Sequence, residues 1–176
     1  FENKDDDCTL NNLGLEDNEL LVIGASGHSS RYFFERLQKE KYTKKIKCLV
    51  RIESEISHLK KLDLNLNFIY SDLDDINFLK ETFRGVKTVL HIAGILFSEE
   101  IIRLGILADV RWFVCVHTTG RYSSFKRASQ EYIRIEDNLL NKHPNLTILR
   151  PTMIYGSSSD QNLWKLINYM DKYNFF

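Results

Sequence analysis

The chain has 176 residues, 43% of them hydrophobic, which suits one domain with a sizeable core and leaves too little sequence for two ordinary domains. Lys and Arg number 24 and Asp and Glu also number 24, so the zero net charge gives no electrostatic footprint for nucleic acid or an anionic membrane. No apolar run is long enough to span a bilayer, no signal segment opens the chain, and the 3 scattered cysteines form no disulfide framework. We therefore expect a cytoplasmic protein with small-molecule partners.

Short apolar runs alternate with amphipathic stretches from residue 19 onward, as is typical of a parallel sheet covered on both faces by helices. Strands are expected at Glu19–Ile23, Lys45–Val50, Asn67–Tyr70, Thr88–Ile92, Trp112–Val116 and Thr147–Leu149. Helices are expected at Arg31–Lys39, Asp75–Phe83, Glu99–Ala108 and Phe125–Asn141. Right-handed crossovers between such units predict an open, doubly wound α/β sheet in three layers, with ligands at the carboxyl ends of the strands.

The two ends of the chain differ from this pattern. Residues 1–18 are polar and acidic, which predicts a flexible arm, and residues 19–176 are assigned to the domain. Leu163–Tyr173 has the periodicity of an amphipathic helix, and the chain stops at two aromatic residues, Phe175 and Phe176. We expect either further residues or a partner to cover this aromatic end.

The first expected strand runs directly into a glycine-containing turn and then into a helical pattern. Gly24 and Gly27 lack a Cβ, so the backbone can approach a pyrophosphate, and the following helix offers N–H groups and a partial positive charge. Ser26 and His28 lie in the same turn. Ser30 replaces the third glycine of the dinucleotide fingerprint, so an ordinary strand-to-helix turn is the alternative.

A basic residue follows the second expected strand. In nucleotide-binding α/β sheets, an acidic side chain at this place binds the ribose 2′-hydroxyl and a basic one accepts a 2′-phosphate. Arg51 occupies it and favours NADP over NAD, while the nearby Glu53 keeps NAD open. An exposed arginine without a ligand is the alternative.

Six motifs recur in order between about residues 21 and 156 and together resemble extended or atypical short-chain dehydrogenases. They are the glycine turn, Leu49-Val50-Arg51, Ser71-Asp72-Leu73, His91-Ile92-Ala93-Gly94, the segment 113–122 and the segment 149–156. The relatives implied are nucleotide-sugar epimerases and dehydratases and the NmrA-like NAD(P)-binding proteins. The resemblance implies a Rossmann domain with a nicotinamide cofactor across the strand ends, and a C-terminal substrate-binding part that is largely absent here.

The motifs and the resemblance together assign ten residues to the cofactor, NADP or NAD, with NADP favoured. These are Gly24, Ser26, Gly27, His28, Arg51, Asp72, Leu73, Ala93, Gly94 and Pro151. No metal site is expected, because the sequence holds no HExxH motif and no Cys/His cluster.

The family's chemistry uses a hydroxyl residue after the fifth strand, and a tyrosine whose pKa is lowered by a lysine four residues later. Thr118 fits the hydroxyl position. One register, counted back from Arg150, places Glu136 on a glutamate common in that helix. Tyr132 then falls on the lysine and Ala128 on the tyrosine, so both proton-transfer residues are missing. A second register places Tyr132 on the tyrosine, but Glu136 would then raise its pKa, so we prefer the first.

Two further residues lie where they could move a proton. Tyr122 and Lys126 form a literal YxxxK pair, although Tyr122 follows Thr118 too closely to reproduce the family's geometry. His117 lies beside Thr118, but a structural role is the simpler interpretation. The candidate catalytic residues are therefore Thr118, Tyr122 and Tyr132.

Two functional hypotheses follow. The preferred one is an NAD(P)-dependent oxidoreductase of the epimerase or dehydratase type, acting by hydride transfer on a nucleotide sugar or similar hydroxylated molecule. The alternative is a catalytically degenerate, NmrA-like sensor or regulator, in which bound cofactor changes a surface that a partner recognises. Neither hypothesis involves nucleic acid or a membrane, and both leave a homodimer open.

Overall fold

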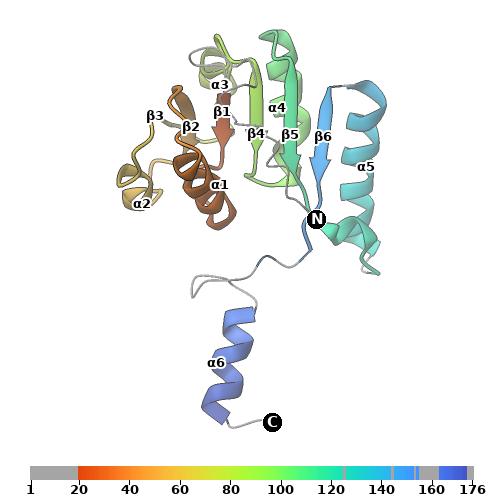
Figure 1. Ribbon diagram of the computed structural model, residues 1–176. Coiled ribbons are helices and arrows are strands. Elements are labelled where there is room, and N and C mark those ends of the chain that lie inside the picture. Colours follow the sequence, from red (N-terminus) through yellow and green to blue (C-terminus); the bar gives the residue numbers. More distant parts are fainter. Residues whose placement is uncertain (1–19, 125, 144, 153, 155–162, 174–176) are drawn as a thin grey trace, which may run out of the picture.

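The computed structural model describes residues 20–124, 126–143, 145–152, 154 and 163–173, and within them one parallel sheet of 6 strands (Figure 1). The strands are β1 (Leu20–Ile23), β2 (Ile46–Val50), β3 (Leu66–Tyr70), β4 (Thr88–His91), β5 (Trp112–Val116) and β6 (Leu146–Leu149). Their spatial order is β3-β2-β1-β4-β5-β6. The chain therefore moves outward from β1 in one direction through β2 and β3, and in the other through β4, β5 and β6. A crevice at the carboxyl ends of β1 and β4 is the expected ligand site of such a sheet.

Helices connect the strands and cover both faces of the sheet. They are α1 (His28–Lys39), α2 (Ser57–Lys60), α3 (Ile76–Thr82), α4 (Ser98–Leu107) and α5 (Lys126–Lys142). One more helix, α6 (Leu163–Tyr173), follows the last strand. Two 3-10 turns, η2 (Ile95–Phe97) and η3 (Thr119–Tyr122), precede α4 and α5. The predicted doubly wound α/β fold is confirmed, whereas α2, η2 and η3 are too short for the sequence pattern to predict. Glu19, Phe125 and the predicted arm 1–18 lie outside the described residues.

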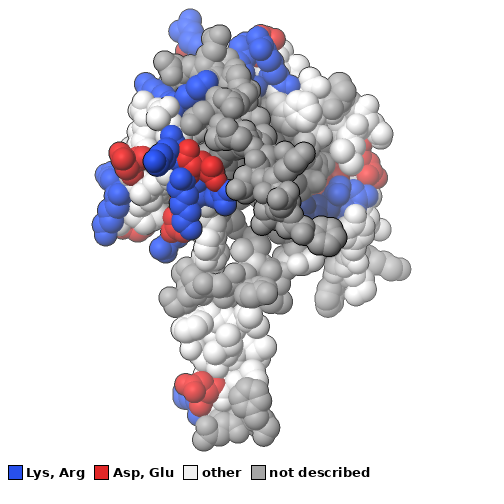
Figure 2. Space-filling model, viewed as in Figure 1, with Lys and Arg blue, Asp and Glu red and all other residues white. Residues whose placement is uncertain are grey.

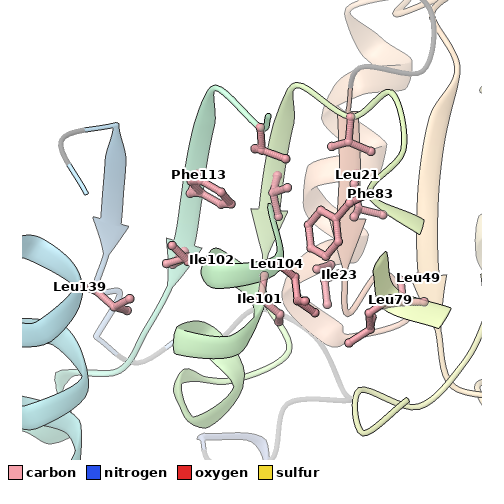
Figure 3. Close-up of a cluster of buried hydrophobic side chains, with 14 of the residues drawn as sticks. Leu21, Ile23, Leu49, Leu79, Phe83, Ile101, Ile102, Leu104, Phe113 and Leu139 are labelled. Carbon is pink, nitrogen blue, oxygen red and sulfur yellow. The ribbon is translucent and has the colours of Figure 1, made fainter. Parts of the chain in front are cut away.

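The sheet is buried on both faces because successive side chains of its strands point to opposite sides. On β1, Leu21 and Ile23 belong to the core cluster that includes side chains of α3, α4 and α5. Leu20 and Val22 belong to the cluster that includes side chains of α1 and α2. Figure 3 shows the first of these clusters, with Phe83 beside the β1 leucine and isoleucine. The result is the predicted three-layer arrangement.

Capping interactions position α3. The Asp75 carboxylate accepts a hydrogen bond from the Phe78 N–H at 3.1 Å, which caps the start of the helix. At the other end, Lys47 Nζ on β2 donates to the carbonyl oxygens of Thr82 at 3.0 Å and Arg84 at 2.6 Å. These bonds fix the start of α3 and attach the segment at its end to β2.

The surface has mixed charge on the face that Figure 2 shows, where basic and acidic side chains are interleaved over α1 and α2. Among the described residues, no helix combines the length and the apolar character needed to cross a membrane. The predicted helix Leu163–Tyr173 is confirmed as α6, and none of its side chains is buried.

Candidate functional site

A cavity of about 420 Å³ opens at the carboxyl ends of β1 to β4, beside the point where the strand order reverses. Its lining residues come from the ends of those strands and the loops that follow them. They are Ile23, Gly24, Ser26, Gly27, Leu49, Val50, Arg51, Ser71, Asp72, Leu73, Asp74, Ile92, Ala93 and Phe97. The cavity thus lies where a doubly wound sheet binds its ligand.

The turn between β1 and α1 is held in a conformation that requires glycine. Gly24 has φ +86°, and a Cβ at this position would lie 2.9 Å from the Ala93 nitrogen, so the turn touches the backbone after β4. Gly27 N–H donates to the Gly24 carbonyl at 3.1 Å. The buried Ser30 hydroxyl donates to the same carbonyl at 2.6 Å. Ser30 is therefore more than a substitute for the third glycine of the fingerprint, because it fastens the turn.

The N-terminus of α1 faces this turn. Gly27 is the N-cap residue, and no side chain caps the helix. The first amide groups of a helix have no partner within the helix, and together with the helix dipole they favour an anion. Gly24, Ser26 and Gly27 line the cavity next to this end, so a pyrophosphate fits here.

The loop after β2 forms the next wall of the cavity. Arg51 is exposed and lines the cavity, and its carbonyl accepts a hydrogen bond from Ser54 N–H at 3.0 Å. The Ser26 hydroxyl donates to Ser54 Oγ at 3.1 Å, which ties this loop to the glycine turn. A guanidinium and two hydroxyl groups therefore lie in neighbouring segments.

The cavity brings together seven of the ten predicted cofactor residues: Gly24, Ser26, Gly27, Arg51, Asp72, Leu73 and Ala93. His28, Gly94 and Pro151 do not line it. The His28 ring lies edge-on to Tyr32, with 5.4 Å between the ring centroids. Seven lining residues were not assigned to the cofactor from the sequence. Most of them belong to the predicted strand ends and motifs, namely Ile23, Leu49, Val50, Ser71 and Ile92, whereas no motif indicated Asp74 or Phe97.

The three predicted catalytic residues lie near one another at η3 but in different surroundings. Thr118 is exposed at the end of β5, and its Oγ1 accepts a hydrogen bond from Gly120 N–H at 3.1 Å, so its own hydroxyl proton can be donated. The Tyr122 side chain is 71% exposed, with the Arg121 guanidinium 5.6 Å from its ring centroid. The Tyr132 ring packs against Gly120, where an added Cβ would lie 2.9 Å from Tyr132 Cε2.

Two residues of the alternative proton-transfer pairs fall outside what the structure describes. The side chains of Lys126 and Ala128 are among those not described. The motif 149–156 is described only at residues 149–152 and 154.

A buried carboxylate joins four elements beside η3. Glu136 on α5 is 0% exposed, and its Oε1 accepts a hydrogen bond from His117 Nδ1 at 2.9 Å. Arg150, after β6, donates to Glu136 Oε2 through Nε at 2.9 Å and Nη2 at 2.7 Å. Arg121 of η3 also donates to this carboxylate. His117 Nε2 accepts from the buried Ser98 hydroxyl at 2.9 Å, because Nδ1 carries the proton given to the carboxylate. We call these five residues the Glu136 cluster.

The protonation states of the Glu136 cluster follow from burial and its hydrogen bonds. Burial raises the pKa of Glu136, but the hydrogen bonds from Arg150, Arg121 and His117 outweigh it and hold the pKa at about 2. Burial lowers the pKa of His117 and outweighs the opposing effect of Glu136. At neutral pH the cluster therefore contains a carboxylate, two guanidinium groups and a neutral imidazole. Both oxygens of the Glu136 carboxylate are therefore bound within the cluster, and the choice between the two registers stays a prediction.

A second buried histidine, His91, is the last residue of β4. His91 is 0% exposed, and its Nε2–H donates to the Gly94 carbonyl at 2.9 Å. Burial lowers its pKa to about 4.

The two cysteines among the described residues are buried thiols. Cys48 and Cys115 are buried, and burial raises the pKa of each thiol to about 12. Within the described part of the chain, no group of three His, Cys, Asp or Glu side chains could hold a metal ion.

Known structures share this architecture at low sequence identity. No protein-family model matches the sequence, and no curated protein matches it. A Rossmann-fold NAD(P)-binding family protein from Shigella flexneri superposes with TM-score 0.68 at 18% identity, covering 89% of this chain and 87% of that one. A short-chain dehydrogenase/reductase from Veillonella parvula in complex with NADP gives 0.64 at 16% identity, covering 84% and 75%.

A double mutant of dTDP-glucose 4,6-dehydratase from Streptomyces venezuelae with NAD bound gives TM-score 0.69 at 17% identity. The match covers 87% of this chain and 62% of the dehydratase. Each likeness is one of fold, and the cavity found here lies at the switch point of that fold. The chain has a Rossmann-type fold, similar to the fold of solved short-chain dehydrogenases/reductases.

Proposed function

We propose that the chain binds a nicotinamide dinucleotide in the cavity at the carboxyl ends of β1 to β4. The observation that carries the proposal is the contact of Gly24 with Ala93, which leaves room for backbone but none for a Cβ, next to the uncapped N-terminus of α1. The pyrophosphate would lie on Gly24, Ser26 and Gly27. Support also comes from structures of the same fold that hold NADP and NAD.

NADP is the proposed cofactor, with Arg51 as the residue that receives the 2′-phosphate. We expect Arg51→Ala to weaken NADPH binding about tenfold or more, because a charge-assisted hydrogen bond to the 2′-phosphate is lost. NADH has no 2′-phosphate, so its binding should weaken less than twofold. Arg51→Lys keeps the charge and should retain part of the preference. The dissociation constants come from the change in nicotinamide fluorescence on binding. Equal losses for the two cofactors would contradict this role for Arg51.

The proposed activity is hydride transfer between the cofactor and a hydroxylated or carbonyl-bearing small molecule, of which a nucleotide sugar is one example. A bound nicotinamide supplies the hydride chemistry. Thr118 donates a hydrogen bond from its hydroxyl group to the reacting oxygen and so polarises it, while its own oxygen accepts from Gly120 N–H. Tyr122 is the exposed phenol nearest to Thr118 in sequence, and it is the residue proposed to transfer the proton to or from the reacting oxygen.

The test is a titration with NAD, NADH, NADP and NADPH, followed by nicotinamide absorbance with a panel of nucleotide sugars. We expect binding of at least NADPH, and turnover that falls about a hundredfold in Thr118→Ala, as is common when a group that acts in the transition state is removed. Thr118→Ser keeps the hydroxyl and is the matched control. Failure to bind any of the four dinucleotides would contradict the proposal.

A second candidate is a dinucleotide sensor without catalysis. Two contacts favour it. The Tyr132 ring packs on Gly120, and the Glu136 carboxylate accepts hydrogen bonds from Arg150 and Arg121. Dinucleotide binding without turnover, and unchanged in Thr118→Ala, would favour the sensor over the enzyme.

A further inference from the structure

The tautomer of His91 is set by its surroundings. Its Nε2 lies 2.9 Å from the Gly94 carbonyl oxygen, which can only accept, so Nε2 carries the proton and Nδ1 keeps a lone pair. This Nδ1 is buried and has no hydrogen-bond partner among the described residues. A buried acceptor without a partner is costly, and an apolar side chain would avoid the cost. The one hydrogen bond that His91 makes is therefore the feature to explain.

That bond anchors a segment with few other attachments. The last ladder bond on this side of β1 runs from Ile92 N–H to the Ile23 carbonyl at 2.9 Å. Neither Ala93 nor Gly94 donates an amide hydrogen bond to another described residue. The Gly94 carbonyl also accepts from Phe97 N–H, at the longer distance of 3.4 Å.

Gly94 has a backbone conformation with positive φ and open space on its Cβ side. Its φ of +116° suits glycine, and nothing lies within 4 Å of the position that a Cβ would take. No packing on that side fixes Gly94, whereas the His91 hydrogen bond holds its carbonyl group.

The anchored segment forms part of the cavity wall. Ala93 lines the cavity and touches Gly24, with 2.9 Å between the Ala93 nitrogen and an added Gly24 Cβ. Phe97, whose N–H shares the Gly94 carbonyl, lines the cavity as well. A shift of Gly94 would therefore move the wall that faces the glycine turn.

We propose that His91 is a positioning residue for the dinucleotide, which holds the Gly94 carbonyl and so keeps the Ala93–Gly94 backbone in place against the glycine turn. The inference rests on the proposed function. A positioning role differs from a role as core filler in one respect. The Nε2–H donor of the His91 ring, and not the volume of the ring, sets the affinity for the cofactor.

Three substitutions separate the donor from the volume. The amide nitrogen of His91→Gln reaches about as far as Nε2 and can donate to Gly94, whereas His91→Asn carries the same amide on a shorter side chain. His91→Leu fills space without a donor. We expect His91→Gln to bind NADPH within about threefold of the wild type, and His91→Asn and His91→Leu to bind at least about tenfold more weakly, a difference of about 1.4 kcal/mol. The melting temperature of His91→Leu should not fall below that of His91→Gln.

Nuclear magnetic resonance without any cofactor gives the second readout. We expect the Ala93 and Gly94 amides to be as rigid in His91→Gln as in the wild type, and more mobile on the ps–ns timescale in His91→Leu. If His91→Leu binds NADPH within twofold of the wild type, the role of His91 is overturned, whereas the proposed function stands. Losses of affinity that follow melting temperature across the three variants would overturn this role as well. No binding of any dinucleotide by the wild-type chain would instead overturn the proposed function, and this inference with it.

Discussion

Replacing Gly24 with alanine is expected to weaken dinucleotide binding strongly. The new Cβ would lie 2.9 Å from the Ala93 nitrogen and 3.0 Å from Ala93 Cα, both of which are backbone atoms. One of the two turns must therefore move, and residues of both line the cavity. We expect NADPH affinity to fall by roughly a hundredfold or more, equivalent to about 2.8 kcal/mol, measured by fluorescence titration.

Gly85 provides a matched control for this substitution. Its φ is +74°, close to the +86° of Gly24, but nothing lies within 4 Å of an added Cβ. Gly85→Ala should therefore cost about the same backbone strain, roughly 1–2 kcal/mol in the free energy of unfolding, and leave affinity unchanged. Equal affinities in the two variants would show that the contact with Ala93 does not shape the site.

Replacing Glu136 with glutamine is expected to destabilise the fold more than any surface substitution. The carboxylate is completely buried and binds Arg150, Arg121 and His117. Removing one partner from a buried ion pair leaves uncompensated charge and typically costs about 3–5 kcal/mol. Chemical denaturation at pH 7 measures the difference in the free energy of unfolding.

Glu100 is the control for the charge itself, because its bond to Arg103 lies on the surface of α4. Glu100→Gln should change the free energy of unfolding by less than about 1 kcal/mol. The pH dependence gives a further check. The folded pKa of Glu136 is about 2, below its ordinary value of 4.5, so its contribution is complete above pH 4.5 and is lost as the pH falls toward 2. The difference in the free energy of unfolding between the wild type and Glu136→Gln should therefore become smaller as the pH falls from 4.5 toward 2. A difference that is independent of pH would contradict the charged state assigned to Glu136.

The sequence was enough to predict the sheet, because burial on both faces leaves near-continuous apolar runs such as 20–23 and 46–50, and glycine marks the turn after the first. It also predicted half of the residues that line the cavity, since strand ends at one edge of a parallel sheet must lie together. Arg51 and Ala93 are examples.

The interactions that depend on three-dimensional contacts could not be predicted in this way. Ser30 looked like a departure from the glycine fingerprint, and only the structure shows its hydroxyl bound to the Gly24 carbonyl. Glu136 and His117 are 19 positions apart, and no periodicity indicates that their side chains meet. The role of His91 likewise depends on the path of the backbone after β4, which a local pattern does not encode.

The central claim is that the cavity at the carboxyl ends of β1 to β4 binds the dinucleotide, and amide chemical shifts during a titration with NADPH test it most directly. We predict the largest changes at Gly24, Gly27, Arg51 and Ala93, which line the cavity. A polar pocket elsewhere on the surface, lined by Lys41 and Asn65 among others, should show none. Changes confined to that second pocket, or an absence of changes at the glycine turn at saturating NADPH, would contradict the account.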